Sequence, residues 1–250
     1  MPVPYRAVFL DVGETLVRAD PSWPGIIANV ASRQGVEVDT AGLLEAERAL
    51  APAIAARFAA GERHTMSLGT SEAFWTWVYD GLLSRCEVDA RVRPAIATAC
   101  HVAFNDFSSW KAFADTQPLL DALDARRAHG LHVGVLSNWE VWLEPLLVRL
   151  GLAAHFDCLT VSGVVGMEKP DPGIFDHALA AAGLDRSTAH LARHVGDSWS
   201  ADVVGANAVG IAPIWLDRDG RATSDRAAST TVIRTLAELP AIIDAGAVRR

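Results

Sequence analysis

The chain contains few cysteines and few lysines. Only three of its 250 residues are cysteines, and no two of them form a Cys-x-x-Cys pair. This excludes a disulfide framework and a zinc ribbon, and it favours a reducing, cytoplasmic location. Of the 22 basic residues only Lys111 and Lys169 are lysines, so the position of each is informative. No Gly-x-Ser-x-Gly motif is present, which argues against a serine hydrolase of that type.

Positive charge and long apolar runs are also scarce. Acidic residues outnumber basic ones, 30 to 22, and the formal net charge is −8. Such a balance provides no basic surface for nucleic acid or for an anionic membrane. No apolar run approaches the roughly 18 residues needed to cross a membrane. We therefore expect a cytoplasmic monomer or homodimer whose partner is neither nucleic acid nor a membrane.

The pattern of apolar residues divides the chain into two parts. A buried strand over 8–10 is followed by helical periodicity, with no strand expected between about Ala19 and Ala114. From there strands and short helices alternate, which is typical of a doubly wound parallel α/β sheet. We predict an α/β core formed by residues 1–18 and 113–250, with an inserted α-helical cap at 19–112. The remaining predicted strands are 131–136, 158–161, 189–195, 211–216 and 231–233.

Four loops at the carboxyl ends of the predicted strands contain polar residues. Asp11 follows the first strand, and Ser137 and Asn138 follow the second. Lys169 lies beyond the third, and the segment 196–202 follows the fourth. Because the carboxyl ends of parallel strands share one edge of the sheet, these distant residues are expected to converge.

The residue types at this edge suit covalent phosphoryl transfer. A carboxylate such as Asp11 can attack phosphorus and divide one difficult step into two easier ones. The negative charges must then be offset, and Mg²⁺ does so through oxygen ligands from one or two carboxylates. We predict Asp11 and Asp197 as metal ligands, with the backbone carbonyl of Gly13 as a third.

The other loop residues are expected to act on phosphate or to support the site. Lys169 would neutralise the nucleophile and the phosphate, and the Ser137 hydroxyl would donate to a phosphoryl oxygen. Asn138 is a further candidate for substrate binding. Asp202 would hold Lys169 or a metal-bound water in place, and Thr15 would support the first loop.

These residues, in this order, resemble the motifs of the haloacid dehalogenase superfamily. That family's first motif is a strand followed by Asp-x-Asp-x-Thr-Leu, and Gly13 replaces its second aspartate here. The other matching residues are Asp11, Thr15 and Leu16, then Ser137, then Lys169-Pro170-Asp171-Pro172, then Gly196, Asp197 and Asp202. The resemblance implies a Mg²⁺-dependent hydrolase, most often of a small phosphorylated metabolite, with a mobile helical cap that selects substrates.

Gly13 leaves three functions open. In phosphatases of the family the second aspartate is the general acid and base, and glycine has no side chain for that role. The chain is then a phosphatase that manages protons otherwise, a phospho-ligand or protein-binding module with little turnover, or a 2-haloacid dehalogenase, whose halide leaving group needs no proton. The cap candidates for substrate contact are Arg18, Trp23, Arg33, Arg48, Arg57, Arg63 and His64.

Overall fold

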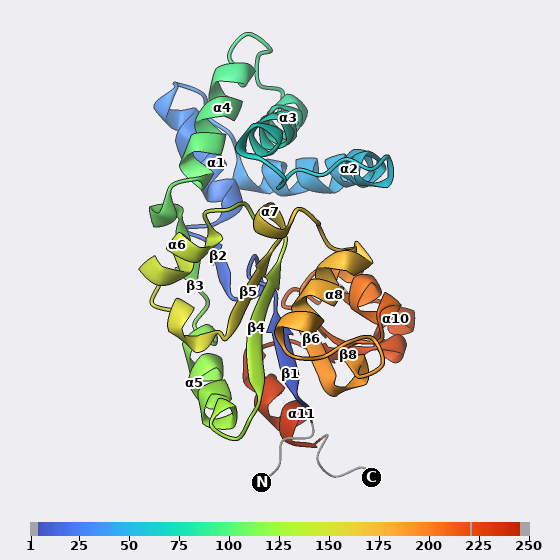
Figure 1. Ribbon diagram of the computed structural model, residues 1–250. Helices are drawn as coiled ribbons and strands as arrows, with labels where there is room; N and C mark the ends of the chain where they lie inside the picture. Colours follow the sequence, from blue (N-terminus) through green and yellow to red (C-terminus); the bar gives the residue numbers. More distant parts are fainter. Residues whose placement is uncertain (1–4, 221, 246–250) are drawn as a thin grey trace. The chain divides into compact units, whose positions relative to one another are not determined.

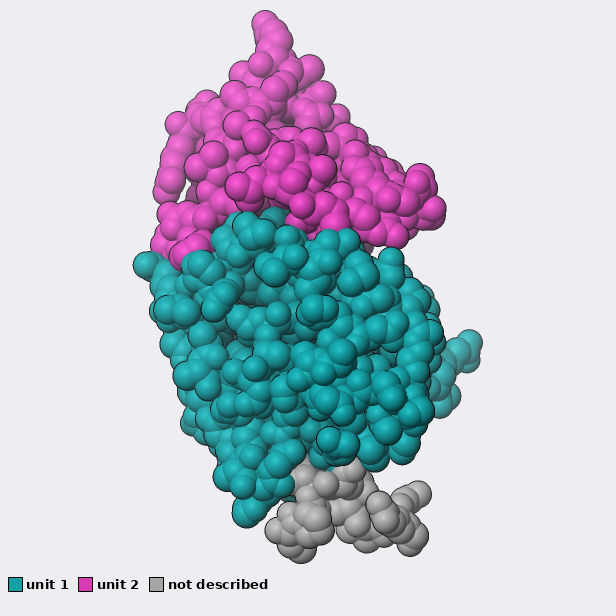
Figure 2. All heavy atoms as spheres, viewed as in Figure 1, with its two compact units in different colours: residues 1–17, 112–250 teal, residues 18–111 magenta. Residues whose placement is uncertain are grey.

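The computed structural model describes residues 5–220 and 222–245, so the two ends of the predicted core, 1–4 and 246–250, lie outside the described residues. The chain divides into two compact units, which Figure 2 colours separately. Unit 1 comprises Met1–Val17 and Ala112–Arg250, and unit 2 comprises Arg18–Lys111.

Unit 1 is built on a six-stranded sheet with the order β5-β4-β1-β6-β7-β8 (Figure 1). Every neighbouring pair is parallel. This confirms the predicted doubly wound parallel α/β sheet. The strands are β1 (Ala7–Leu10), β4 (His132–Ser137), β5 (Cys158–Val161), β6 (Ala192–Gly196), β7 (Ala212–Leu216) and β8 (Thr231–Ile233).

Helices cover both faces of this sheet. All four residues of β1 are buried, as expected for a central parallel strand. Ala7 and Phe9 pack on Ile174 and Phe175 of α8, and in Figure 1 α5 lies on the other side of the sheet. Asp171 caps α8 by accepting from the Gly173 N–H. The helices are α5 (Thr116–Arg127), α6 (Leu143–Arg149), α7 (Ser162–Val165), α8 (Pro172–Ala181), α9 (Gly205–Ala208), α10 (Ser224–Ser229) and α11 (Leu239–Ala245).

Unit 2 consists of four helices around its own apolar core. Asp39 and Ser67 cap the second and third of them through hydrogen bonds to backbone N–H groups. Leu43, Phe74 and Ile96 are buried in the shared core. No described helix is both long and apolar enough to cross a membrane. The helices are α1 (Trp23–Arg33), α2 (Thr40–Ala59), α3 (Leu68–Arg85) and α4 (Arg93–Phe104).

Two local features differ from the prediction. The chain passes between the units through β2 (Val17–Ala19) and β3 (Trp110–Ala112), which pair as a small sheet where no strand was expected. Three-residue strands are too short to display a period of two, so their pairing is a tertiary effect. The helix predicted near 201–208 begins instead as a π-helix, η4 (Trp199–Val204), and continues as α9.

The strand order places a topological switch point beside β1. From β1 the sheet extends through β4 and β5 on one side and through β6, β7 and β8 on the other. In open α/β sheets, ligands bind at the carboxyl ends of the strands at such a point. The loops after β1, β4 and β6 are therefore where a site is expected.

Candidate active site

The candidate site lies where β1, β4 and β6 end. Leu10 is in register with Val135 on one side and Val195 on the other, and Asp11 follows directly. The Asp11 N–H donates to the Val195 carbonyl at 2.9 Å, which fixes the start of the loop. Ser137 is the last residue of β4, and Asp197 follows the last residue of β6.

Lys169 joins the site to the loop beyond β5. Its Nζ donates to Asp11 Oδ1 at 2.8 Å, to Asp202 Oδ1 at 2.5 Å and to the Leu136 carbonyl at 2.9 Å. All three ammonium protons are thus used, and the residue is only 5% exposed. Burial alone would lower the pKa of Lys169, but the charges of Asp11 and Asp202 raise it above its ordinary value. Lys169 is therefore a buried cation between two carboxylates.

Asn138 holds the backbone of Lys169. Its Nδ2 donates to the Lys169 carbonyl at 2.9 Å, and its Oδ1 accepts from the Lys169 N–H at 2.7 Å. Both ends of the Asn138 amide are thus engaged with the main chain. The structure therefore gives Asn138 a role in positioning Lys169, whereas the sequence indicated only contact with a ligand.

Asp202 is the centre of a buried hydrogen-bond network. Besides Lys169 it accepts from His194 Nε2 at 2.9 Å and from the Ser198 N–H at 2.9 Å. Burial raises the pKa of Asp202, but Lys169 and His194 outweigh it and hold that pKa below the ordinary value. A Cβ at Gly196 would lie 2.2 Å from Asp202 Cγ, so this approach requires glycine. From the sequence, His194 was considered only as a metal ligand paired with His190 and was rejected; its contact with Asp202 was not predicted, although it lies two residues before Gly196 on β6.

Three carboxylates converge on one point. One oxygen each of Asp11, Asp197 and Asp202 lies within 4.8 Å of the others. Burial raises the pKa of Asp11, the charge of Asp202 raises it further, and Lys169 acts in the opposite direction. No backbone N–H of the described residues donates to the Gly13 carbonyl. Hard oxygen donors of this kind suit Mg²⁺, and since Asp202 already accepts three hydrogen bonds, Asp11, Asp197 and the Gly13 carbonyl fit it best.

Two hydroxyl groups beside Asp11 are buried without a hydrogen bond. Ser137 is 1% exposed and Thr15 is fully buried, and neither hydroxyl oxygen reaches hydrogen-bond geometry with a described residue. The Ser137 hydroxyl is still close enough to Asp11 to lower the pKa of that carboxyl. Buried hydroxyl groups are nearly always paired, so unused donors at this place fit the oxygens of a phosphoryl group.

The first loop is held by Arg218, a residue to which no sequence motif assigned a role. Arg218 forms two hydrogen bonds with Asp115, at 2.9 and 3.0 Å. Its Nη2 also donates to the Thr15 carbonyl at 2.9 Å, and its guanidinium lies 3.9 Å from the centroid of the Phe113 ring. The loop that carries Asp11 is thereby tied to the segment that enters α5.

An indole lies over Gly13. A Cβ built on Gly13 would be 3.2 Å from Cζ3 of Trp139, which is closer than an ordinary contact. Trp139 is buried, and its backbone N–H and carbonyl both bond to the Ser162 hydroxyl, at 2.9 and 3.1 Å. The space that a side chain at position 13 would enter is therefore partly filled by Trp139.

Glu14 adopts a backbone conformation that favours glycine. Its φ is 52°, and Glu87 in unit 2 is the other non-glycine residue with positive φ among those described. A left-handed backbone costs an L-residue about 1–2 kcal/mol. Glycine avoids this cost, but its greater conformational freedom in the unfolded chain offsets part of the gain. We expect Glu14→Gly and Glu87→Gly each to raise the free energy of unfolding by about 1 kcal/mol, measured by urea denaturation.

The pair of variants also tests whether Glu14 takes part in chemistry. Both glutamates are exposed, and Glu87 belongs to unit 2, whereas the four loops belong to unit 1. Glu87→Gly should leave activity unchanged. A loss of activity in Glu14→Gly alone, with the same gain in stability, would assign a catalytic role to Glu14; a fall in stability would contradict the strain argument.

The predicted cap candidates belong to unit 2, where three of them engage neighbouring groups. Arg57 forms an ion pair with Glu62 and lies 4.1 Å from the centroid of Trp77. Arg63 donates to the Glu62 carbonyl at 2.8 Å. His64 stacks on Phe74 with ring centroids 4.5 Å apart. Substrate contact by these residues stays a prediction, as it does for Arg18, Trp23, Arg33 and Arg48.

Known proteins similar to this chain agree with the geometry of the site. A protein-family model described as haloacid dehalogenase-like hydrolase matches residues 5–210. The chain belongs to the haloacid dehalogenase-like hydrolase family. This confirms the resemblance drawn from the four loops. The chain is 29% identical over 244 residues to haloacid dehalogenase-like hydrolase domain-containing protein 3 of Danio rerio, covering 96% of this chain and 97% of that protein.

Other members of the family are similar over different lengths. The phosphoserine phosphatase of Thermus thermophilus is 38% identical over 117 residues, which is 46% of this chain and 45% of that protein. The structure of the putative HAD-hydrolase YfnB from Bacillus subtilis, bound to magnesium, has a TM-score of 0.72 at 17% identity. That match covers 96% of this chain and 99% of YfnB, and it shows a shared fold. The haloacid dehalogenase-like hydrolases similar to this chain thus include phosphatases.

Proposed function

We propose that this hydrolase is a Mg²⁺-dependent phosphatase of small phosphorylated metabolites that acts through an aspartyl-phosphate at Asp11. The observation that carries the proposal is the contact of Lys169 Nζ with Asp11 and Asp202 beside the three-carboxylate cluster. A buried cation that orients one carboxylate oxygen leaves the other free to attack. Similarity to a phosphoserine phosphatase across 46% of the chain supports the same reaction class.

The metal would be held by Asp11, Asp197 and the Gly13 carbonyl. When bound, Mg²⁺ offsets the charge of the phosphate and of the attacking carboxylate. The Trp215 indole N–H donates to the Asp197 carbonyl at 2.9 Å and so fixes the loop from which the Asp197 side chain extends. The side chain of Asp202 is committed to Lys169, His194 and Ser198 and would keep Lys169 in place.

The chain's own residues would supply the nucleophile and the hydrogen-bond donors of the reaction. A carboxylate oxygen of Asp11 forms a bond to phosphorus while the ester P–O bond breaks and the leaving oxygen departs with the electron pair. Lys169 and the Ser137 hydroxyl donate to the phosphoryl oxygens as their charge increases. Water then attacks phosphorus, the Asp11–phosphorus bond breaks, and inorganic phosphate and the Asp11 carboxylate are released.

Proton transfer to the leaving oxygen is the step for which Gly13 provides no general acid. An ester whose leaving group has a low pKa, such as an aryl phosphate, needs no proton from the protein. An alkyl phosphate does need one, and a positioned acid contributes typically 10²–10⁴-fold. We therefore propose a preference for phosphate esters with good leaving groups.

This preference can be changed by supplying the acid. Because Trp139 lies 3.2 Å from a Cβ at position 13, the aspartate needs space, so we pair Gly13→Asp with Trp139→Leu. The double variant should raise kcat/KM for an alkyl phosphate relative to an aryl phosphate by about 10²-fold. The single variant Trp139→Leu is the control and should leave this ratio unchanged. An equal ratio in the double variant and the control would contradict the proposed role of position 13.

The proposed function is tested by the release of inorganic phosphate from an aryl phosphate with Mg²⁺ and with EDTA. We expect release with Mg²⁺ and its loss in EDTA. A parallel assay measures halide release from a short 2-haloacid in EDTA. Halide release without phosphate release would show that the protein is a dehalogenase and not a phosphatase. The absence of both activities would favour a phospho-ligand-binding module.

A further inference from the structure

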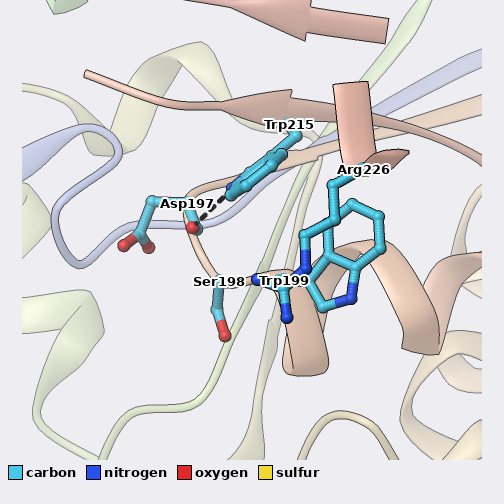
Figure 3. A pocket seen from close by; sticks show the side chains of 5 residues that line it. All are labelled: Asp197, Ser198, Trp199, Trp215 and Arg226. Carbon is cyan, nitrogen blue, oxygen red and sulfur yellow. Dashed lines mark hydrogen bonds between the residues drawn. The ribbon is translucent and has the colours of Figure 1, made fainter. Parts of the chain in front are cut away.

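A cleft lies beside the metal ligand Asp197. It encloses about 250 Å³ and is lined by Asp197, Ser198, Trp199, Trp215 and Arg226 (Figure 3). These residues come from the loop after β6, the start of η4, the carboxyl end of β7 and the helix α10. In Figure 3 the Asp197 carboxylate extends away from the two indoles, whereas its backbone carbonyl accepts from Trp215. The cleft and the phosphoryl site thus share one loop.

Two tryptophan rings form the walls of the cleft. Trp215 is buried, and its ring packs edge-on against Trp199 with centroids 5.0 Å apart. The Arg226 guanidinium lies 4.8 Å from the centroid of Trp199. Stacking on an aromatic ring orients a guanidinium without using any of its N–H donors. Arg226 is therefore a preorganised cation at the rim of the cleft.

Arg226 has no acidic partner among the described residues. Eight other arginines among the described residues form ion pairs with aspartate or glutamate side chains; they are Arg57, Arg91, Arg93, Arg126, Arg127, Arg186, Arg218 and Arg234. Arg226 differs from these eight in lying without an acidic partner on an aromatic ring next to the candidate site, in a chain with a net charge of −8. The negative field of the protein disfavours anions elsewhere, so this cation marks where one is tolerated.

The remaining polar groups of the cleft also favour an anionic ligand. The Asp197 carbonyl already accepts from Trp215, and the Ser198 hydroxyl accepts from the Ala201 N–H. No described residue accepts from the Trp199 indole N–H or from the Arg226 guanidinium. Apart from the Asp197 carboxylate, which extends away from the two indoles in Figure 3, the groups still available are donors, and the ligand they fit is an acceptor with negative charge.

We propose that this cleft binds a carboxylate or phosphate anion through Arg226 and Trp199. The anion is either a second acidic group on the substrate or a free anion bound beside it. The first source rests on the proposed phosphatase function, whereas the second does not. Binding an additional anion here would make the enzyme selective for phosphate esters that carry two anionic groups.

The cleft is tested first without turnover. Inorganic phosphate is titrated into ¹⁵N-labelled protein, and the indole N–H signals of Trp199 and Trp215 are followed, assigned with Trp→Phe variants. We expect both signals to shift to saturation in the wild type and in Arg193→Met, and not in Arg226→Met. Arg193 is the matched control because its guanidinium also lies on an aromatic ring, 3.8 Å from the centroid of Tyr5, at the opposite end of β6. Equal shifts in all three proteins would overturn the proposal.

Kinetics then distinguish the two sources. The kcat/KM values for phenyl phosphate and 2-carboxyphenyl phosphate are compared in the same proteins, and the ratio of variant to wild type removes the difference in leaving group. If the substrate supplies the anion, Arg226→Met lowers this ratio about fivefold for the carboxylated ester alone, and Arg226→Lys recovers part of it. Equal ratios, together with lost indole shifts, assign the cleft to a free anion. If the wild type hydrolyses neither ester, the phosphatase proposal fails while the titration still decides the anion site.

Discussion

Asp11→Asn is expected to lower phosphate release by more than about 10³-fold, because an amide cannot attack phosphorus and form the covalent intermediate. The substitution keeps the size of the side chain and one oxygen for Lys169 Nζ, which lies 2.8 Å from Asp11 Oδ1. It also removes one of the three carboxylates of the cluster. Phosphate release from an aryl phosphate at saturating Mg²⁺ measures the effect.

The control for this variant is Asp176→Asn. Asp176 is an aspartate of α8 that pairs with Arg186 at the surface, outside the four loops. It should retain the wild-type rate. A rate for Asp11→Asn within tenfold of this control would show that the covalent route through Asp11 is wrong.

Lys169→Met is expected to damage both activity and stability. Without the cation, the carboxylates of Asp11 and Asp202 are left close together and buried, with Asp202 only 1% exposed. Removing one partner of a buried ion pair costs about 3–5 kcal/mol, because the remaining charge is not compensated. We expect a loss of that size in the free energy of unfolding in EDTA, measured by denaturant titration, and phosphate release below about 10⁻³ of wild type.

The other lysine provides the matched comparison. Lys111 is exposed and lies in β3, and Lys111→Met removes the same group from the surface. Surface substitutions of this kind usually change stability by less than about 0.5 kcal/mol. If the two variants lost the same stability and the same activity, Lys169 would have no special role in the site.

Much of the fold could be predicted because its signals are local. The apolar run that ends at Leu10 and the alternation of strands with short helices indicated the parallel sheet, and the strands lie within a few residues of their predicted bounds. The loops that carry Asp11, Ser137 and Asp197 could be placed at one edge because parallel strands end together. The pairing of β2 with β3 could not be predicted, since neither strand has enough residues to show the two-residue alternation of a β-strand.

The parts of the site that the sequence did not indicate depend on tertiary contacts. In the sequence, nothing marks His194 as a partner of Asp202. Its role becomes visible only in the structure, where Asp202 Oδ1 lies 2.9 Å from its Nε2. Trp139 follows Ser137 and Asn138 directly, yet only the structure places its ring over Gly13. Arg226 is one exposed arginine of many, and its position on Trp199 beside Asp197 comes from the packing of α10. Sequence spacing carries no information about such contacts between distant segments.

The most direct test of the central claim is to locate the covalent phosphate. The enzyme is quenched during turnover of an aryl phosphate, reduced with borohydride and digested, and its peptides are examined by mass spectrometry. An aspartyl-phosphate at Asp11 predicts conversion of that residue to homoserine in the wild type and no such product in Asp11→Asn. Turnover with no modified peptide, or with the modification on another residue, would contradict the mechanism proposed for this site.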